Sequence, residues 1–225
     1  MREADRLDVR GVATTDVGTD AVADAELLRA GRAAVKVAVI ADRAVSYGVG
    51  TPADAGYLRR AVRCGVPIVP RTSGGTGVLL GPGDLTWALV LPRGDRRVGR
   101  GFVRAYDRLG QGIVDALDAH GVDAAWGPPL DRSPECCLLG GRGRVLRVGD
   151  RVVGGAAQHL TGSALLHHGV VLAAPDRALG ARVFDLARAD PDRLVGTDAL
   201  GVPGPRSAWA HAVAEALARS LDDPR

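Results

Sequence analysis

The chain has 225 residues, of which 46% are hydrophobic and 4% aromatic, and its formal net charge is +3. This size and hydrophobic content predict one folded domain with a sizeable core. Lys36 is the only lysine among 29 basic residues, and no basic run is interleaved with aromatic side chains, which argues against nucleic-acid binding. No apolar run approaches the roughly 18 residues of a membrane-spanning helix, and the N-terminus lacks the apolar core of a signal peptide. We therefore expect a cytoplasmic protein with no membrane segment.

Cysteine usage adds a second exclusion. The chain has 3 cysteines, two of them adjacent as Cys136 and Cys137, which is not the pattern of a disulfide framework. Neither Cys-x-x-Cys nor His-Glu-x-x-His occurs, so no metal site is expected. In a reducing compartment the cysteines are thiols.

Apolar periodicity and turn residues predict alternating helices and strands along the chain. Helices are expected at residues 20–33, 51–64, 98–120, 175–187 and 207–221. Strands are expected at residues 7–12, 34–40, 44–48, 66–69, 85–91, 122–126, 135–139, 144–148, 151–159 and 165–174. We read one α+β domain over residues 1–225, with a mixed, mostly antiparallel sheet and helices packed against it. Residues 1–6 are expected to be disordered, and residues 176–225 to add helices but no separate accessory domain.

Three local expectations follow from the same patterns. Lys36 alternates with apolar neighbours and is expected to point outward from its strand. The apolar spacing over residues 98–120 predicts one long helix. Cys136 and Cys137 are expected to face opposite sides of one short strand.

The segment 71–85 is rich in glycine and joins two apolar runs. Its glycines let the backbone approach a ligand closely, and successive N–H groups there can form an anion-binding nest. Arg71 at its start carries a fork of donors suited to a carboxylate or phosphate. A plain hairpin loop would have the same composition. The segment lacks the Gly-x-x-x-x-Gly-Lys-Ser/Thr pattern of a P-loop.

Three stretches together carry a resemblance to a known family. They are Arg71-x-Ser73-Gly74-Gly75-x-x-Val78 with Gly83-Asp84-Leu85, then Asp150-Arg-Val-Val-Gly-Gly-Ala-Ala-Gln158, then Ala164-Leu-Leu-His-His-Gly-Val-Val-Leu172. In this order and spacing they resemble the signatures of the lipoate–protein ligase and octanoyltransferase family. The resemblance implies the biotin/lipoate ligase fold, which is related to class II aminoacyl-tRNA synthetase cores. Biotin attachment is a weaker hypothesis, because the biotin ligase Gly-Arg-Gly-Arg-x-Gly-x-x-Trp loop is absent.

The resemblance also implies an activity, its cofactors and its partners. Members attach lipoate or octanoate to a lysine of a lipoyl carrier domain, of the glycine cleavage H protein or 2-oxoacid dehydrogenase E2 type. Ligases use ATP and Mg, transferases take octanoate from a carrier thioester, and some members work with an accessory subunit. The implied substrate-binding residues are Arg71, Ser73, Gly74, Gly75, Gly77, Val78, Asp84, Val152, Gly155 and Ala157. The implied catalytic residues are Cys137, Arg151 and His168.

Cys137 favours a transferase within this family. In a cysteine-dependent branch the nucleophile lies fifteen residues before the lysine of Gly-Arg-Lys, and Cys137 lies at that distance from Val152, the equivalent position. A thiolate is a suitable nucleophile for thioester exchange. A buried apolar thiol remains the alternative.

Val152 is the main departure from the family pattern. The family lysine there stabilises developing negative charge, and valine cannot. We predict that Arg151 or Arg147 enters the site beside Val152, helped by a one-residue bulge. The alternative is a catalytically impaired relative that binds an acyl group or a lipoyl domain as a subunit.

Overall fold

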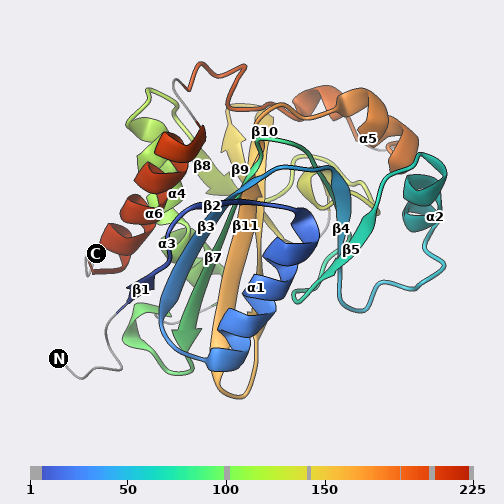
Figure 1. Cartoon of the computed structure of the whole chain (residues 1–225). Helices are drawn as coiled ribbons and strands as arrows, with labels where there is room; N and C mark the ends of the chain where they lie inside the picture. Colours follow the sequence, from blue (N-terminus) through green and yellow to red (C-terminus); the bar gives the residue numbers. More distant parts are fainter. Residues whose placement is uncertain (1–6, 99–101, 141–142, 188, 203–205, 223–225) are drawn as a thin grey trace.

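The computed structural model describes residues 7–98, 102–140, 143–187, 189–202 and 206–222 (Figure 1). Its centre is a sheet with the strand order β1-β3-β7-β11-β10-β9-β8, and β2 pairs with β3 beside this path. In chain order these strands are β1 (Asp8–Val9), β2 (Ala13–Thr15), β3 (Ala34–Ile40), β7 (Leu85–Pro92), β8 (Ala125–Gly127), β9 (Arg144–Val148), β10 (Arg151–Leu160) and β11 (Ala164–Val171). β1 and β2 run parallel to β3, and the other pairs are antiparallel. The predicted mixed, mostly antiparallel sheet of an α+β fold is confirmed.

A second, three-stranded sheet has the order β5-β4-β6. It consists of β4 (Ala44–Gly48), β5 (Ile68–Arg71) and β6 (Gly77–Leu80). The segment expected as one glycine-rich loop therefore contains a strand, and the turn between β5 and β6 carries Ser73, Gly74 and Gly75. Gly48 lets β4 pass close beneath this turn, because a Cβ on Gly48 would lie 2.2 Å from the carbonyl oxygen of Gly75.

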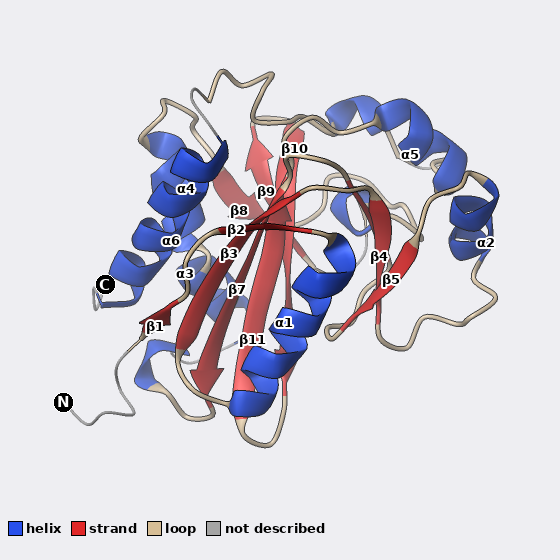
Figure 2. Cartoon of the chain, in the orientation of Figure 1, coloured by secondary structure: helices blue, strands red, loops and turns tan. Residues whose placement is uncertain are grey.

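Helices cover both faces of the central sheet (Figure 2). On one face α1 (Val17–Ala30) packs Leu27 and Leu28 against apolar side chains of β3, β7 and β11. On the other face lie α3 (Phe102–Leu109), α4 (Gln111–Asp118) and α6 (Arg206–Asp222), which share a core with β3 and β7. As a result β3 and β7 are buried along nearly their whole length.

The remaining helical elements lie beside the smaller sheet or in connections. α2 (Gly56–Arg63) and α5 (Arg177–Val183) contact each other next to that sheet (Figure 1). Short 3-10 turns are η2 (Arg96–Val98), η3 (Cys137–Leu139) and η4 (Pro191–Arg193).

The prediction of a single helix over residues 98–120 is wrong. Residues 99–101 lie outside the described ranges, and the rest forms α3 and α4 with Gly110 between them. Trp126 explains the break: a Cβ on Gly110 would lie 2.6 Å from its indole ring, and its Nε1 donates to the carbonyl oxygen of Gly110 at 3.0 Å. The indole N–H therefore binds a carbonyl oxygen that a continuous α-helix would pair with the N–H four residues later.

Two further local expectations are corrected. Lys36 does not point into solvent but is 8% exposed, because both faces of β3 are covered. The expected strand over residues 135–139 does not form: Cys136 makes one isolated bridge to Gly77, and Cys137 begins η3. The hydroxyl of Ser133 accepts the backbone N–H of Cys136 at 3.0 Å, which curls this segment into a turn.

Candidate active site

A cavity of about 510 Å³ lies between α1, the β5–β6 turn, η3 and the strands β10 and β11. Much of its wall is apolar, with side chains of Val17, Val78, Leu80, Leu138 and Val170. Polar groups at the same cavity come from separate parts of the chain, among them Arg71, Cys137 and His168. A concave, mostly apolar space with a few convergent polar groups is typical of a small-molecule site.

Arg71 organises the glycine-rich turn. Its Nε donates to the Ser73 hydroxyl at 3.2 Å, and its Nη1 donates to the Ser46 carbonyl at 3.1 Å. Its Nη2 donates to the carbonyl oxygens of Gly74 at 2.8 Å and Thr76 at 3.0 Å. All three guanidinium nitrogens thus donate to protein acceptors, so the role of Arg71 is to fix the conformation of the turn.

The sulfur of Cys137 faces the cavity and is surrounded by polar groups. The backbone N–H of Thr76 points at Sγ from 3.0 Å, and the Thr76 hydroxyl lies 3.3 Å away. Nη2 of Arg71 lies 3.5 Å from the same sulfur. Hydrogen-bond donors and a cation at these distances stabilise negative charge on sulfur. Cys136, by contrast, is 3% exposed in an apolar cluster, and burial raises the pKa of its thiol to about 12.

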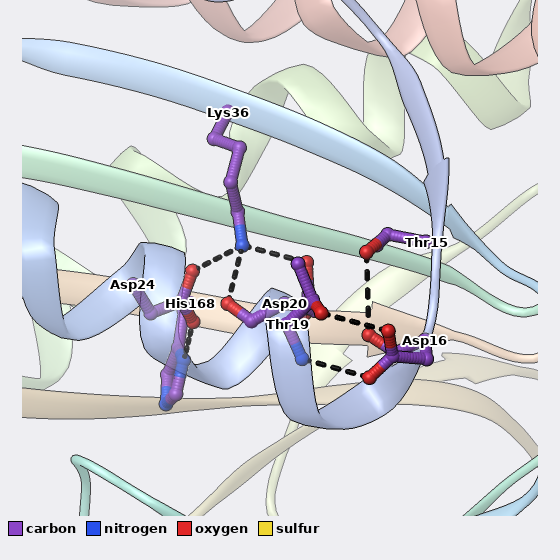
Figure 3. A network of polar contacts seen from close by, with 7 residues as sticks. All are labelled: Thr15, Asp16, Thr19, Asp20, Asp24, Lys36 and His168. Atoms are coloured by element: carbon purple, nitrogen blue, oxygen red, sulfur yellow. Dashed lines mark hydrogen bonds and ion pairs between the residues drawn. The ribbon is translucent and has the colours of Figure 1, made fainter.

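Behind His168 a buried network of charges extends into the protein (Figure 3). His168 Nδ1 lies 2.7 Å from Asp24 Oδ2, and its Nε2 lies 2.7 Å from the Ser73 hydroxyl. Lys36 Nζ reaches Asp24 Oδ1 at 2.5 Å and Asp20 Oδ1 at 2.6 Å. The N-cap of α1, where Asp16 accepts the Thr19 N–H at 2.9 Å, fixes the turn that presents the two carboxylates.

The carboxylates of Asp20 and Asp24 share Lys36 as their cation, and the pKa of Asp20 is raised while that of Asp24 is lowered. Burial alone would raise the pKa of Asp24, but the His168 hydrogen bond and the charge of Lys36 outweigh it and hold that pKa below its usual value. Burial, together with the charge of Asp24, raises the pKa of Asp20. Burial opposes the charge on Lys36, yet the two carboxylates outweigh it and raise the lysine pKa. Asp24 and Lys36 therefore form the more strongly ionised pair of the cluster.

Most of the residues expected at the site are brought together by the fold. Those lining the cavity are Arg71, Gly74, Gly75, Val78, Cys137, Gly155, Ala157 and His168. Ser73 is fully buried behind the turn and contacts His168 instead of the cavity. Gly77 packs against Tyr57 and Phe184. Asp84 lies at the end of the segment, where its carboxylate accepts the N–H groups of Ala173 at 2.7 Å and Gly81 at 2.9 Å.

The expectation that Arg151 or Arg147 enters the site beside Val152 is wrong. Val152 is fully buried in an apolar cluster, next to the chain segment at Leu194. The strand irregularity falls between Val152 and Gly154, one residue too late to turn Arg151 inward, and Arg151 is exposed. The Arg147 guanidinium packs against Gly127 instead.

Several residues at the site were not anticipated from the sequence. Arg144 lines the cavity and pairs with Asp107 through two bonds of 2.7 Å. Asp24 lines the cavity and contacts His168, and Lys36 pairs with Asp24. The sequence contains a signal for this cluster. Asp20 and Asp24 lie one helical turn apart, so both carboxylates are on the same face of the helix, and that face meets the chain's single lysine.

A family model described as the lipoyl protein ligase A/B catalytic domain matches residues 34–194, more than half of the chain. The chain belongs to this family. No curated protein sequence matches it. The resemblance noted in the sequence is thereby confirmed at the level of the family.

Solved structures of lipoate ligases share the fold of this lipoyl ligase family member. A lipoate–protein ligase A bound with ATP is 19% identical with a TM-score of 0.72, covering 96% of this chain and 85% of that one. The bi-partite lipoate protein ligase of Thermoplasma acidophilum, studied with its E2 lipoyl domain, is 19% identical with a TM-score of 0.70 (98% and 86% covered). P. falciparum LipL1 in complex with lipoate is 13% identical with a TM-score of 0.66 (96% and 63% covered).

The described residues of this family member offer neither a metal site nor a membrane-spanning helix. Within the described ranges no group of three or more His, Cys, Asp or Glu side chains could hold a metal ion. None of the helices among those residues is both long and apolar enough to cross a membrane.

Proposed function

We propose that this protein transfers an octanoyl group from a carrier-bound thioester to a lysine of a lipoyl carrier domain, with Cys137 as the intermediate acyl carrier. The observation that carries this proposal is the position of Cys137: its sulfur faces a mostly apolar cavity of about 510 Å³ and is surrounded by the Thr76 N–H, the Thr76 hydroxyl and Arg71. Membership in the lipoyl ligase family supports the acyl class and the acceptor. The T. acidophilum ligase studied with its E2 lipoyl domain suggests the same kind of partner here.

The reaction would run in two steps. In the first, the Cys137 thiolate attacks the thioester carbonyl, the bond to the donor sulfur breaks, and the donor thiolate takes a proton from solvent. In the second, the neutral amine of the acceptor lysine attacks the Cys137 thioester, the C–S bond breaks, and the amine proton leaves to water as the Cys137 thiolate is regenerated. Apolar side chains such as Val78 and Leu138 would hold the acyl tail, at about 0.8 kcal/mol per buried CH₂.

An ATP-dependent ligase fits the described residues less well. Such a reaction needs cations free to face the phosphates. Of the described side chains that line the cavity, the cations are Arg71 and Arg144, and protein acceptors hold both. The proposed transfer therefore uses neither ATP nor Mg.

A second candidate function is a binding relative that has lost the chemistry. Val152 favours it, because the valine at the family's lysine position is buried among apolar side chains, and neither Arg147, its partner on β9, nor the exposed Arg151 lines the cavity. Such a protein would hold an acyl group or a lipoyl domain without transfer.

One assay separates the three possibilities. The purified protein is incubated with octanoyl-carrier thioester and an unmodified lipoyl domain without ATP, and the mass of the domain is followed. We expect octanoylation that Cys137→Ser abolishes and the neighbouring control Cys136→Ala retains. Product formed only from free lipoate and ATP would make the protein a ligase. Octanoyl-carrier binding without product under either condition would establish the binding relative.

A further inference from the structure

Lys36 occupies an unusual position for the only lysine of a chain. It is 8% exposed, and its Nζ donates hydrogen bonds to Asp20 Oδ1 at 2.6 Å and to the Asp20 carbonyl at 3.0 Å (Figure 3). The same Nζ forms an ion pair with Asp24 Oδ1 at 2.5 Å. Burying such a cluster costs desolvation energy and adds little net stability. Stability alone is therefore a weak reason for placing the cluster here.

The cluster is connected to the candidate nucleophile by an unbroken series of contacts. From Asp24 the series runs to His168 at 2.7 Å and on to the Ser73 hydroxyl at 2.7 Å. Arg71 Nε donates to the same hydroxyl at 3.2 Å, and Arg71 Nη2 lies 3.5 Å from Cys137 Sγ.

The hydrogen bonds of this series can all point the same way. Ser73 accepts from Arg71 and has one hydroxyl proton to give, and the acceptor at 2.7 Å is His168 Nε2. His168 then donates its Nδ1–H to Asp24 Oδ2, which leaves Asp24 Oδ1 for Lys36. In this arrangement every donor has an acceptor, as buried polar groups require. Lys36 fixes the end of the series, because it holds the Asp24 carboxylate in the orientation that His168 needs.

We infer that Lys36 is a positioning residue, which acts through Asp24, His168 and Ser73 to keep the Arg71 guanidinium against Cys137. The inference rests on the proposed role of Cys137 as nucleophile. Asp20 provides an internal comparison, since it shares the lysine with Asp24 but does not contact His168. If Lys36 only stabilised the fold, neutralising Asp20 and neutralising Asp24 would have similar effects.

The test measures alkylation of Cys137, which needs neither an acyl donor nor a carrier. Iodoacetamide labelling is followed by peptide mass spectrometry in a Cys64→Ser background, and the rate at pH 6.5 is divided by the rate at pH 9. Alkylation proceeds through the thiolate, and a guanidinium held beside a sulfur is expected to favour that charged form. The phenols near Cys137, Tyr57 and Tyr106, stay neutral over this range because burial raises the pKa of both.

We expect Lys36→Met and Asp24→Asn to lower this ratio about ten-fold, Lys36→Arg to restore most of it, and Asp20→Asn to leave it near that of the parent. Asp24→Asn keeps the test decisive if Lys36→Met does not fold, because it preserves side-chain shape. An unchanged ratio in Asp24→Asn, or an equal fall in Asp20→Asn, would overturn the inference. If the ratios behave as expected while no octanoyl transfer occurs, the proposed function fails and the positioning role stands.

Discussion

The Nη2 atom of Arg71 lies 3.5 Å from Sγ of Cys137, although 66 positions separate the two residues in the chain. The contact joins the glycine-rich turn after β5 to the first residue of η3, and Gly75 makes it possible. A Cβ on Gly75 would lie 2.8 Å from Arg71 Nη2 and 3.1 Å from Cys137 Sγ, and its φ of +94° is strained for any other residue.

Gly75→Ala should therefore damage both the site and the fold. We expect the substitution to cost about 1–2 kcal/mol of unfolding free energy from the positive φ alone. Displacing Arg71 or Cys137 should lower octanoyl transfer roughly 100-fold. Urea unfolding and single-turnover transfer would measure the two effects. Gly74→Ala is the matched comparison for stability, because the space around a Cβ there is open. Equal stability losses in the two variants would contradict this account.

Asp84 should make the protein less stable as the pH rises from 4 to 6. Burial raises the pKa of Asp84 to about 6 in spite of the N–H groups of Ala173 and Gly81, whereas the unfolded chain has the ordinary value of 3.8. The folded state thus holds the proton more tightly, and the stabilising effect of that proton is lost as the pH passes 6. Relative to Asp84→Asn, the wild type should lose roughly 2–3 kcal/mol over this window. Urea unfolding of both proteins between pH 4 and 7 gives the difference. A difference that grows in favour of the wild type would show that the carboxylate is stabilised as an anion.

His167 should have the opposite pH dependence. Burial among Trp87, Tyr106 and the sheet lowers the pKa of His167 to about 3, with a further contribution from His168, so the folded protein keeps this imidazole neutral. The unfolded chain binds the proton below pH 6.5, so the folded state loses relative stability as the pH falls.

The matched variant for this effect is His167→Gln, which has no titrating group and can still contact Gln158, now 3.1 Å from the ring. Between pH 6.5 and 5 the wild type should lose roughly 2 kcal/mol relative to this variant. Parallel stability profiles of the two proteins would mean that His167 is protonated in the folded state.

Sequence patterns were sufficient for the elements whose signals are local. The apolar runs at residues 34–40 and 85–91 predict strands, and both strands form the buried centre of the sheet. The burial of Lys36 could not be predicted from the alternation of residues along the strand. Alternation indicates a solvent-facing side only when one face of a strand is open, and here α1 and α6 cover both faces of β3.

The site itself depended on contacts between distant segments. The family resemblance identified Cys137 and residues of the glycine-rich turn, and the structure places Cys137, Gly74 and Gly75 on one cavity. The surroundings of Val152 could not be predicted, because the segment at Leu194 that covers it lies some forty residues further along the chain. The turn at Ser133, which replaces the expected strand, likewise depends on one side-chain hydrogen bond.

An octanoyl thioester on Cys137 is the intermediate that distinguishes the proposed transferase, and the intact mass of the protein detects it. Wild type, Cys137→Ser and Cys136→Ala are incubated with octanoyl-carrier thioester alone, quenched in acid and weighed by mass spectrometry. The account predicts one added octanoyl group on the wild type and on Cys136→Ala, removable by hydroxylamine, and none on Cys137→Ser. No adduct on the wild type, or an adduct that survives in Cys137→Ser, would contradict it.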